Sequence, residues 1–191
     1  MPVNLDDYAA PANAPETQAV RREALLAQLG WLIVEAEALG PLMAALPPNV
    51  LMGRPMPDTH SVKETFGLLA TLDHEVHAPQ VARMLSEDTP ALVRADEAAL
   101  AEGSAWNDTD LAVLLDGMRD ARQALLDQLT AVPLDAWQRT ATLSGDADDP
   151  ALLTLGSYVL GVCQHDADRL RDLAYRLHES KLTSRAEDLP K

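Results

Sequence analysis

Apolar residues recur at helical spacing in four long stretches of this chain, and no stretch alternates as a convincing strand would. The first helix is predicted from about residue 15 to 45. Pro15 suits its first turn, and the Gly40-Pro41 pair should kink or divide it. Its core face is expected to carry Leu25, Leu26, Leu29, Leu32, Ile33 and Ala36.

The second helix has the clearest start. Ser61 and Glu64 match the S-x-x-E pattern of a capping box, so the helix should begin directly after Ser61. Pro79 should bend this helix in its second half, because proline removes a backbone donor and crowds the preceding turn. The apolar face is expected to carry Phe66, Leu69, Leu72, Val76 and Val81.

The third and fourth helices follow longer connections. Asn107 or Asp108 can cap the third helix, and the fourth is predicted from about Thr154 to His178. Residues 86–107 are predicted to be a mostly polar connection with one helical turn, and residues 131–150 a second loop. Long helices joined by long loops predict an all-α protein with a four-helix bundle.

The predicted bundle fills most of the 191 residues as a single domain. It is expected to span residues 15–179. A flexible N-terminal segment at 1–14 and a C-terminal tail at 180–191 are expected on either side of it.

The net charge of −15, from 30 acidic and 15 basic residues, limits the classes of partner that the protein is expected to bind. A surface this acidic repels phosphate, so neither nucleic acid nor an anionic membrane is an expected partner. The longest charge-free, mostly apolar stretch, 151–163, is too short to span a bilayer and suits a buried helix. The start of the chain lacks the features of a signal peptide, and Cys163 is the single cysteine, so we expect a cytoplasmic protein.

Three stretches in series resemble the DinB-like superfamily. "GRPMPDTHSVKETFGLLATLD" (53–73) is similar to the segment where typical members read R-P-x-P-G-x-W-S-V-x-E-x-x-x-H-L. "RADEAALAEGSAWNDTDLAVLLDGMRDARQALLDQL" (94–129) resembles the part leading through the third helix of the family. "LTLGSYVLGVCQHDADRL" (153–170) resembles the fourth helix, which usually contains H-D-x-x-H.

The resemblance implies a fold and a chemistry. The family fold is a four-helix bundle with an up-up-down-down arrangement, and many members are homodimers. Many hold a divalent metal with one histidine from the second helix and two from the fourth. The residues of this chain assign no cofactor of their own, and zinc or nickel is the metal that the resemblance would imply.

Only one of the three metal-ligand positions that the resemblance implies is occupied by a histidine in this sequence. The ligand position of the second helix falls on Leu68, and those of the fourth helix fall on His165 and Arg169. His60 stands where the family has a tryptophan. Because Leu68 cannot coordinate a metal and Arg169 is a permanent cation, the resemblance implies a metal site that has been lost.

Four residues therefore define the candidate pocket: Glu64, Leu68, His165 and Arg169. Arg169 could pair with the carboxylate of a small anionic ligand, or it could belong to a solvated ion-pair face with Asp166 and Asp172. His74 and His77 lack a third ligand and are interpreted as surface or interface residues.

Three functions remain open at this stage. The first is a DinB-like protein with a degenerate metal site that at most binds a small molecule. The second is a metal-dependent transferase or hydrolase that combines His165 with unconventional ligands such as Glu64, Glu35 or Glu37. The third is a dimeric structural or interaction module without a pocket.

Overall fold

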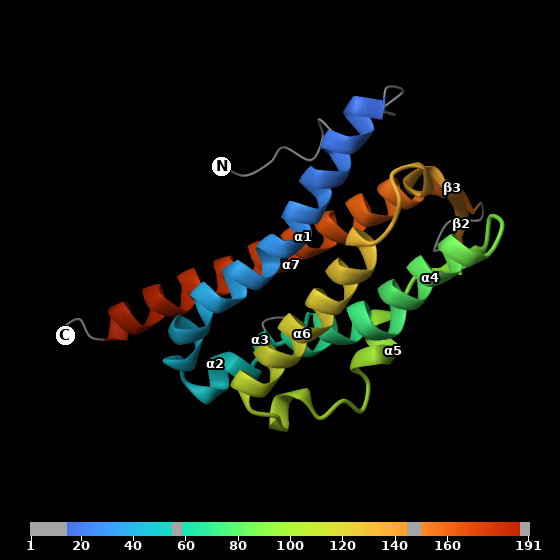
Figure 1. Ribbon diagram of the computed structural model, residues 1–191. Coiled ribbons are helices and arrows are strands. Elements are labelled where there is room, and N and C mark those ends of the chain that lie inside the picture. Colours follow the sequence, from blue (N-terminus) through green and yellow to red (C-terminus); the bar gives the residue numbers. More distant parts are fainter. Residues whose placement is uncertain (1–14, 55–58, 145–149, 188–191) are drawn as a thin grey trace.

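The computed structural model describes residues 15–54, 59–144 and 150–187 (Figure 1). The long helices are α1 (Pro15–Ala44), α6 (Leu111–Thr130), α7 (Leu155–Glu187) and the composite α3 (Val62–Thr71), η2 (Leu72–His77) and α4 (Ala78–Ser86). The shorter elements are α2 (Pro48–Met52), β1 (Ala91–Val93), α5 (Glu97–Ala101), η3 (Trp106–Asp108), η4 (Asp135–Gln138), β2 (Thr140–Ser144) and β3 (Ala151–Thr154).

The four long helices form a bundle, which confirms the expected all-α fold class. Contacts between helices fix their directions. The α3–η2–α4 unit runs parallel to α6, as shown by the side-chain bonds Ser61–Asn107, Asp73–Arg122 and Gln128–Ala78. It runs antiparallel to α7, as shown by the bonds Arg176–His60 and His77–Tyr158.

Helix α1 is antiparallel to α6, because Arg22 bonds to Thr130 near one end and Gly40 lies beside Leu115 near the other. The first and last helices therefore run one way, and the two middle helices run the other way (Figure 1). This order differs from the expected up-up-down-down arrangement. The physical reason is that residues 87–110 lead the chain back along the bundle before α6 begins, so α6 repeats the direction of α3 and α4.

A three-stranded sheet extends one end of the bundle, so the expectation of no strands was wrong. Strand β1 pairs in parallel with β2, and β2 pairs antiparallel with β3. The strands are three to five residues long, too short for an alternating pattern to stand out in the sequence. Strands β1 and β2 lie in the two segments predicted as loops, and β3 takes the first residues of the stretch predicted as a buried helix.

Helix ends agree with local signals where these are strong. The capping box of Ser61 and Glu64 is confirmed: each side chain accepts a hydrogen bond from the backbone N–H of the other residue. Helix α6 is capped by Asp110 rather than by Asn107 or Asp108, because η3 occupies those positions. Helix α1 continues through Pro41 to Ala44.

The helix containing Pro79 changes form just before the proline. Residues Leu72–His77 form a π-helix, in which the N–H of Ala78 donates to the carbonyl of Asp73. Pro79 has no N–H and its ring crowds the turn before it, so a wider turn there relieves the clash. The predicted irregularity therefore occurs one turn earlier than Pro79 itself.

The apolar core consists of two clusters, one toward each end of the bundle. The cluster near the sheet includes Leu25, Leu29, Val81, Met84, Leu125, Leu129, Trp137 and Val159. The cluster at the other end includes Leu32, Ala36, Phe66, Leu69, Leu114, Met118 and Leu173. Both contain side chains from all four long helices, so the bundle is held together at two levels.

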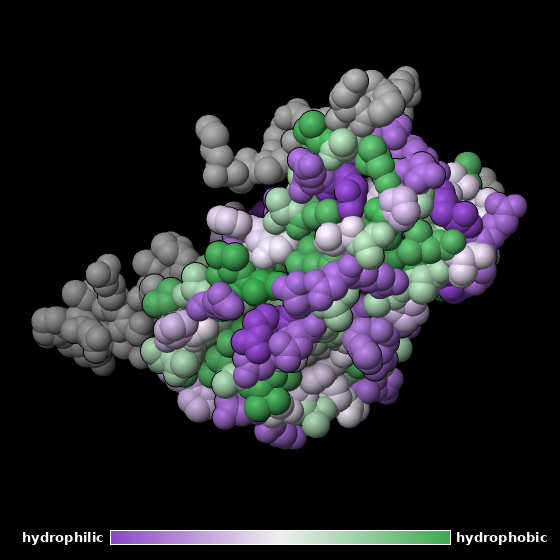
Figure 2. All heavy atoms as spheres, viewed as in Figure 1, coloured by the Kyte–Doolittle hydropathy of each residue, from purple (hydrophilic) through white to green (hydrophobic). Residues whose placement is uncertain are grey.

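Helix α1 also exposes apolar side chains to solvent. Val20, Trp31, Val34 and Leu42 are each about half exposed, and Figure 2 shows hydrophobic residues interspersed with hydrophilic ones on this face. By length and composition alone, Thr17–Ala44 could cross a membrane. Its other face packs into the core, as in any bundle helix. The expected homodimer would cover such a surface and stays a prediction.

Two glycines in helix interiors provide a matched test of the packing. A Cβ on Gly67 of α3 would overlap the ring of Trp106, whereas a Cβ on Gly117 of α6 meets nothing within 4 Å. Gly67→Ala should therefore lower the free energy of unfolding by about 1–3 kcal/mol. Gly117→Ala should raise it by about 0.5–1 kcal/mol, because alanine lowers the entropy of the unfolded chain. Urea denaturation of both variants measures the difference, and equal effects would contradict this packing.

Candidate functional site

Glu97 joins the two polar positions of the predicted pocket on α7. Its Oε1 lies 2.9 Å from Nε2 of His165, and its Oε2 accepts a hydrogen bond from Nη2 of Arg169. Arg169 Nε lies 3.2 Å from the same Nε2 of His165. The hydrogen bond with His165, followed by the charge of His165 and of Arg169, outweighs partial burial and lowers the pKa of Glu97. The three side chains form a closed ion cluster.

Helix α5 positions this carboxylate. The helix begins directly after Asp96, whose Oδ1 accepts a hydrogen bond from the N–H of Ala99 at 3.0 Å. Glu97 is thus the first residue of the helix and projects toward α7. Sequence reasoning missed it, because its segment was predicted as a polar connection; the cap at Asp96 was the available signal.

Glu64 makes its hydrogen bonds with residues outside the ion cluster. Arg54 donates to both of its oxygens at 2.8 and 2.6 Å, and Asn107 Nδ2 donates at 2.9 Å. Burial raises the pKa of Glu64, but the hydrogen bonds from Arg54 and from the backbone of Ser61 outweigh it and the pKa is lowered. This carboxylate fastens the start of α3 and has no contact with His165.

Two cavities lie on either side of the ion cluster. The outer cavity, of about 830 Å³, is lined by Arg54, His60, Glu64, Glu97 and Arg169 with parts of α5. The sheet-side cavity, of about 400 Å³, has Glu97 and His165 at one end. Both cavities therefore share the carboxylate of Glu97.

The fourth predicted residue, Leu68, is fully buried and lines neither cavity. It stands one turn after Glu64 and one turn before Leu72, which line the outer and the sheet-side cavity respectively. Leu68 therefore lies at the level of the ion cluster. The structure brings Glu64, His165 and Arg169 to the same region, with Leu68 filling the gap as an apolar side chain.

The residues here do not fit a metal centre. Leu68 offers no donor atom, and the guanidinium of Arg169 bonds to the carboxylate of Glu97 and lies 3.2 Å from the imidazole of His165, which places a permanent positive charge where a metal ion would have to bind. His60 comes within 3.8 Å of Glu97, and burial, followed by the charge of Arg169, lowers the pKa of His60, so its imidazole is neutral. Among residues 15–54, 59–144 and 150–187, no three His, Cys, Asp or Glu side chains have an arrangement that could hold a metal ion.

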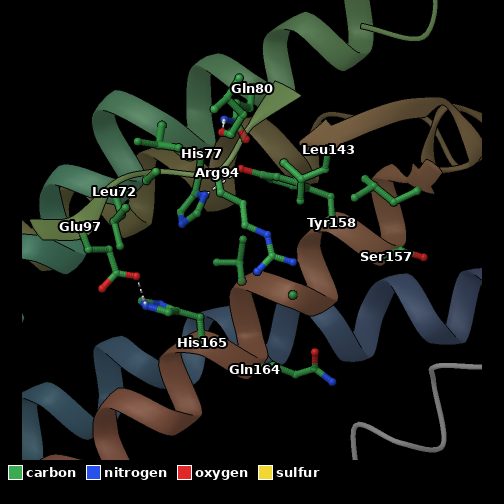
Figure 3. Close-up of a pocket in the computed structure, with 16 residues that line it drawn as sticks. Leu72, His77, Gln80, Arg94, Glu97, Leu143, Ser157, Tyr158, Gln164 and His165 are labelled. Carbon is green, nitrogen blue, oxygen red and sulfur yellow. Dashed lines mark hydrogen bonds and ion pairs between the residues drawn. The ribbon is translucent and has the colours of Figure 1, made fainter. Parts of the chain in front are cut away.

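The sheet-side cavity contains a second polar group (Figure 3). His77 Nδ1 lies 2.8 Å from the hydroxyl of Tyr158, and the two rings meet edge to face. Burial lowers the pKa of His77 to about 3 and raises that of Tyr158, so both are neutral at physiological pH. His77 is therefore a half-buried residue of the cavity wall, whereas His74 is exposed, as expected for a surface residue.

A buried charge triad lies beside the site. Arg122 is fully buried and donates to Asp73 at 2.6 and 3.1 Å and to Asp166 at 2.5 and 3.2 Å. Burial raises the pKa of Asp73 to about 6, although Arg122 opposes this. Burial lowers the pKa of Arg122, but the two carboxylates outweigh it and raise the pKa above its usual value. Asp166 is thus a buried partner of Arg122 rather than a solvated partner of Arg169.

A family model and solved structures match the chain. The model of the DinB superfamily matches residues 32–173, so this chain belongs to the DinB superfamily. Among solved structures, the chain is similar to YfiT from Bacillus subtilis, described as "a probable metal-dependent hydrolase with an unusual four-helix bundle topology". The TM-score is 0.69 at 15% sequence identity, over 94% of this chain and 99% of that one. No protein of curated function matches.

Removing the guanidinium of the triad should be costly. Arg122→Met leaves two carboxylates buried without a counter-charge, which should lower the free energy of unfolding by about 3–5 kcal/mol. Arg119→Met is the control, since Arg119 of the same helix pairs with Asp116 and Asp120 at the surface, where solvent screens the charges and the loss of stability should be much smaller. Chemical denaturation of both compares them, and a similar small loss would contradict the triad.

The triad should also make stability depend on pH. Because the pKa of Asp73 rises from 3.8 to about 6 on folding, its protonation favours the folded state. The stability of the wild type relative to Asp73→Asn should therefore be greatest at about pH 4 and fall as the pH rises through about 6. Denaturation of both proteins across this range gives the difference, and an increase with pH would contradict the raised pKa.

Proposed function

We propose that this protein is a metal-independent member of the DinB superfamily that binds a small molecule in the bundle, beside the Glu97–His165–Arg169 ion cluster. The observation that carries the proposal is the pair of bonds from Glu97 to His165 and Arg169. In this arrangement a cation fixed on α7 takes the place of the metal charge.

The groups of the cluster that could bind a metal are already paired with one another. The carboxylate of Glu97 neutralises Arg169, and the same carboxylate occupies His165. Leu68 adds a buried apolar side chain at the remaining ligand position. These features support retention of the bundle and its cavities with a different use of the centre, and the proposal contains no catalytic step.

Two alternative functions are weighed against this proposal. A metal-dependent hydrolase would have to recruit His60, Glu97 and His165, which converge but are interrupted by Arg169. A purely structural module is less well supported, because two cavities adjoin the cluster. We further propose a cytoplasmic location, because a single free cysteine, Cys163, fits a reducing compartment, and a homodimer formed through exposed apolar side chains such as Trp31 of α1.

Restoring the missing ligands tests the proposal. The double variant Leu68→His/Arg169→His places histidines at all three family positions together with His165, a ligand set that suits zinc or nickel. Untagged protein, incubated with either metal and desalted, should then retain about one metal ion per chain. Wild-type protein should retain far less. Elemental analysis measures both.

The control variant is Leu68→His/Arg171→His. It adds the same number of histidines, but Arg171 is exposed and bonds to Asp168 at the surface, so no three-histidine site results. Circular dichroism checks that each variant folds. If Leu68→His prevents folding, the metal content of the single variant Arg169→His is measured instead. Near-stoichiometric metal in the wild type, lost in His165→Ala, would overturn the proposal and favour a metal-dependent enzyme.

A further inference from the structure

We propose that the sheet-side cavity binds a small organic carboxylate, with Arg94 holding the charged end and the apolar wall of the cavity holding the body. This inference rests on the proposed small-molecule binding and names the class of ligand and the residues that recognise it. Four observations lead to it.

The cavity has the size and lining of a small-molecule site. Its volume of about 400 Å³ lies within the usual range for ligand pockets, which are mostly apolar with a few placed polar groups. It forms where the sheet covers the gap between η2 and α7. The apolar wall is made by Leu72, Val76, Val93, Leu143, Leu153 and Val162.

Gly161 keeps the α7 side of the cavity open. It lines the cavity, and a Cβ added there meets no atom within 4 Å. Glycine weakens a helix interior relative to other residues. A side chain at this position would therefore begin at the cavity wall with its Cβ in open space.

Arg94 supplies an uncompensated positive charge. Its guanidinium reaches from the end of β1 into the cavity, between His77 and α7 (Figure 3). Its backbone N–H donates to the carbonyl of Ser144 at 3.0 Å, which fixes the start of the side chain against the sheet. Within the described part of the chain, the guanidinium has no carboxylate partner, whereas nearby Arg83 pairs with Glu87. A guanidinium beside apolar surface favours a carboxylate, which it can bind with two parallel hydrogen bonds.

The opposite end of the cavity has the opposite charge. Glu97 stands there, and its negative charge would repel a ligand carboxylate and turn it toward Arg94. His77 stays neutral because it is buried, and Arg94 is the one arginine or lysine among the lining residues. One guanidinium matches the single charge of a monocarboxylate better than the double charge of a phosphate ester.

The test compares acids with uncharged analogues of the same shape. Hexanoate, octanoate, benzoate and phenylacetate are titrated into the full chain by calorimetry, each beside the matching primary alcohol. Wild-type protein should bind at least one acid about tenfold or more tightly than its alcohol, as expected for a charge-assisted hydrogen bond. Arg94→Gln should abolish this preference, whereas Arg119→Gln, which removes a surface arginine of α6 paired with Asp116 and Asp120, should keep it.

Gly161→Leu provides an independent test, because it fills the cavity and leaves Arg94 intact. It should weaken both acid and alcohol by about tenfold or more, while the helix becomes no less stable because leucine is the better helix former. If acid and alcohol bind equally and Gly161→Leu weakens both, the proposed pocket stands but the carboxylate inference is wrong. If Arg94→Gln keeps the preference, the inference is also wrong. If no acid or alcohol binds to the wild type, both proposals fall.

Discussion

The buried guanidinium of Arg122 constrains the arrangement of three helices at once. It lies between the two apolar clusters and bonds to Asp73 of η2 and Asp166 of α7. Desolvating three charges costs several kcal/mol per ion, so the arrangement is stable only when the pairing is complete. A slip of one helix relative to the others would leave a charge buried and unpaired. The triad therefore fixes the register of η2, α6 and α7 more strictly than apolar packing alone.

The register that the triad fixes also determines where the side chains of the candidate site lie. Asp166 directly follows His165, and Asp73 stands four residues before His77, so the triad sets where both imidazoles lie. The ion cluster around Glu97 then ties the connecting segment to α7. This short network joins α5 to α7 at the same level of the bundle as the triad's neighbour His165.

The parts of this fold that were predictable depend on local signals. Ser61 and Glu64 cap a helix wherever they occur with this spacing, and the apolar period of the long helices survives in the structure. The charge triad was missed, because an arginine among core positions of α6 and an aspartate beside His165 look like surface residues when each is considered alone. Glu97 was missed for a related reason: the cap at Asp96 predicts a helix, but only the path of the chain brings that carboxylate to α7. The strands were too short to register as a pattern.

Glu97 explains why the two cavities differ in character. Its carboxylate forms the shared wall, and Arg169 supports that wall from the outer side while His165 supports it from the sheet side. On the outer side, Arg54 is also paired, with Glu64, so the positive charges bordering that cavity are already satisfied. On the sheet side, the charge of Glu97 faces apolar residues and the guanidinium of Arg94. A polar molecule would compete with internal ion pairs in the outer cavity, whereas an amphipathic anion would meet an unpaired guanidinium and an apolar wall in the other. Because Glu97 pairs with Arg169 and leaves Arg94 unpaired, the sheet-side cavity is the one that would select such a ligand.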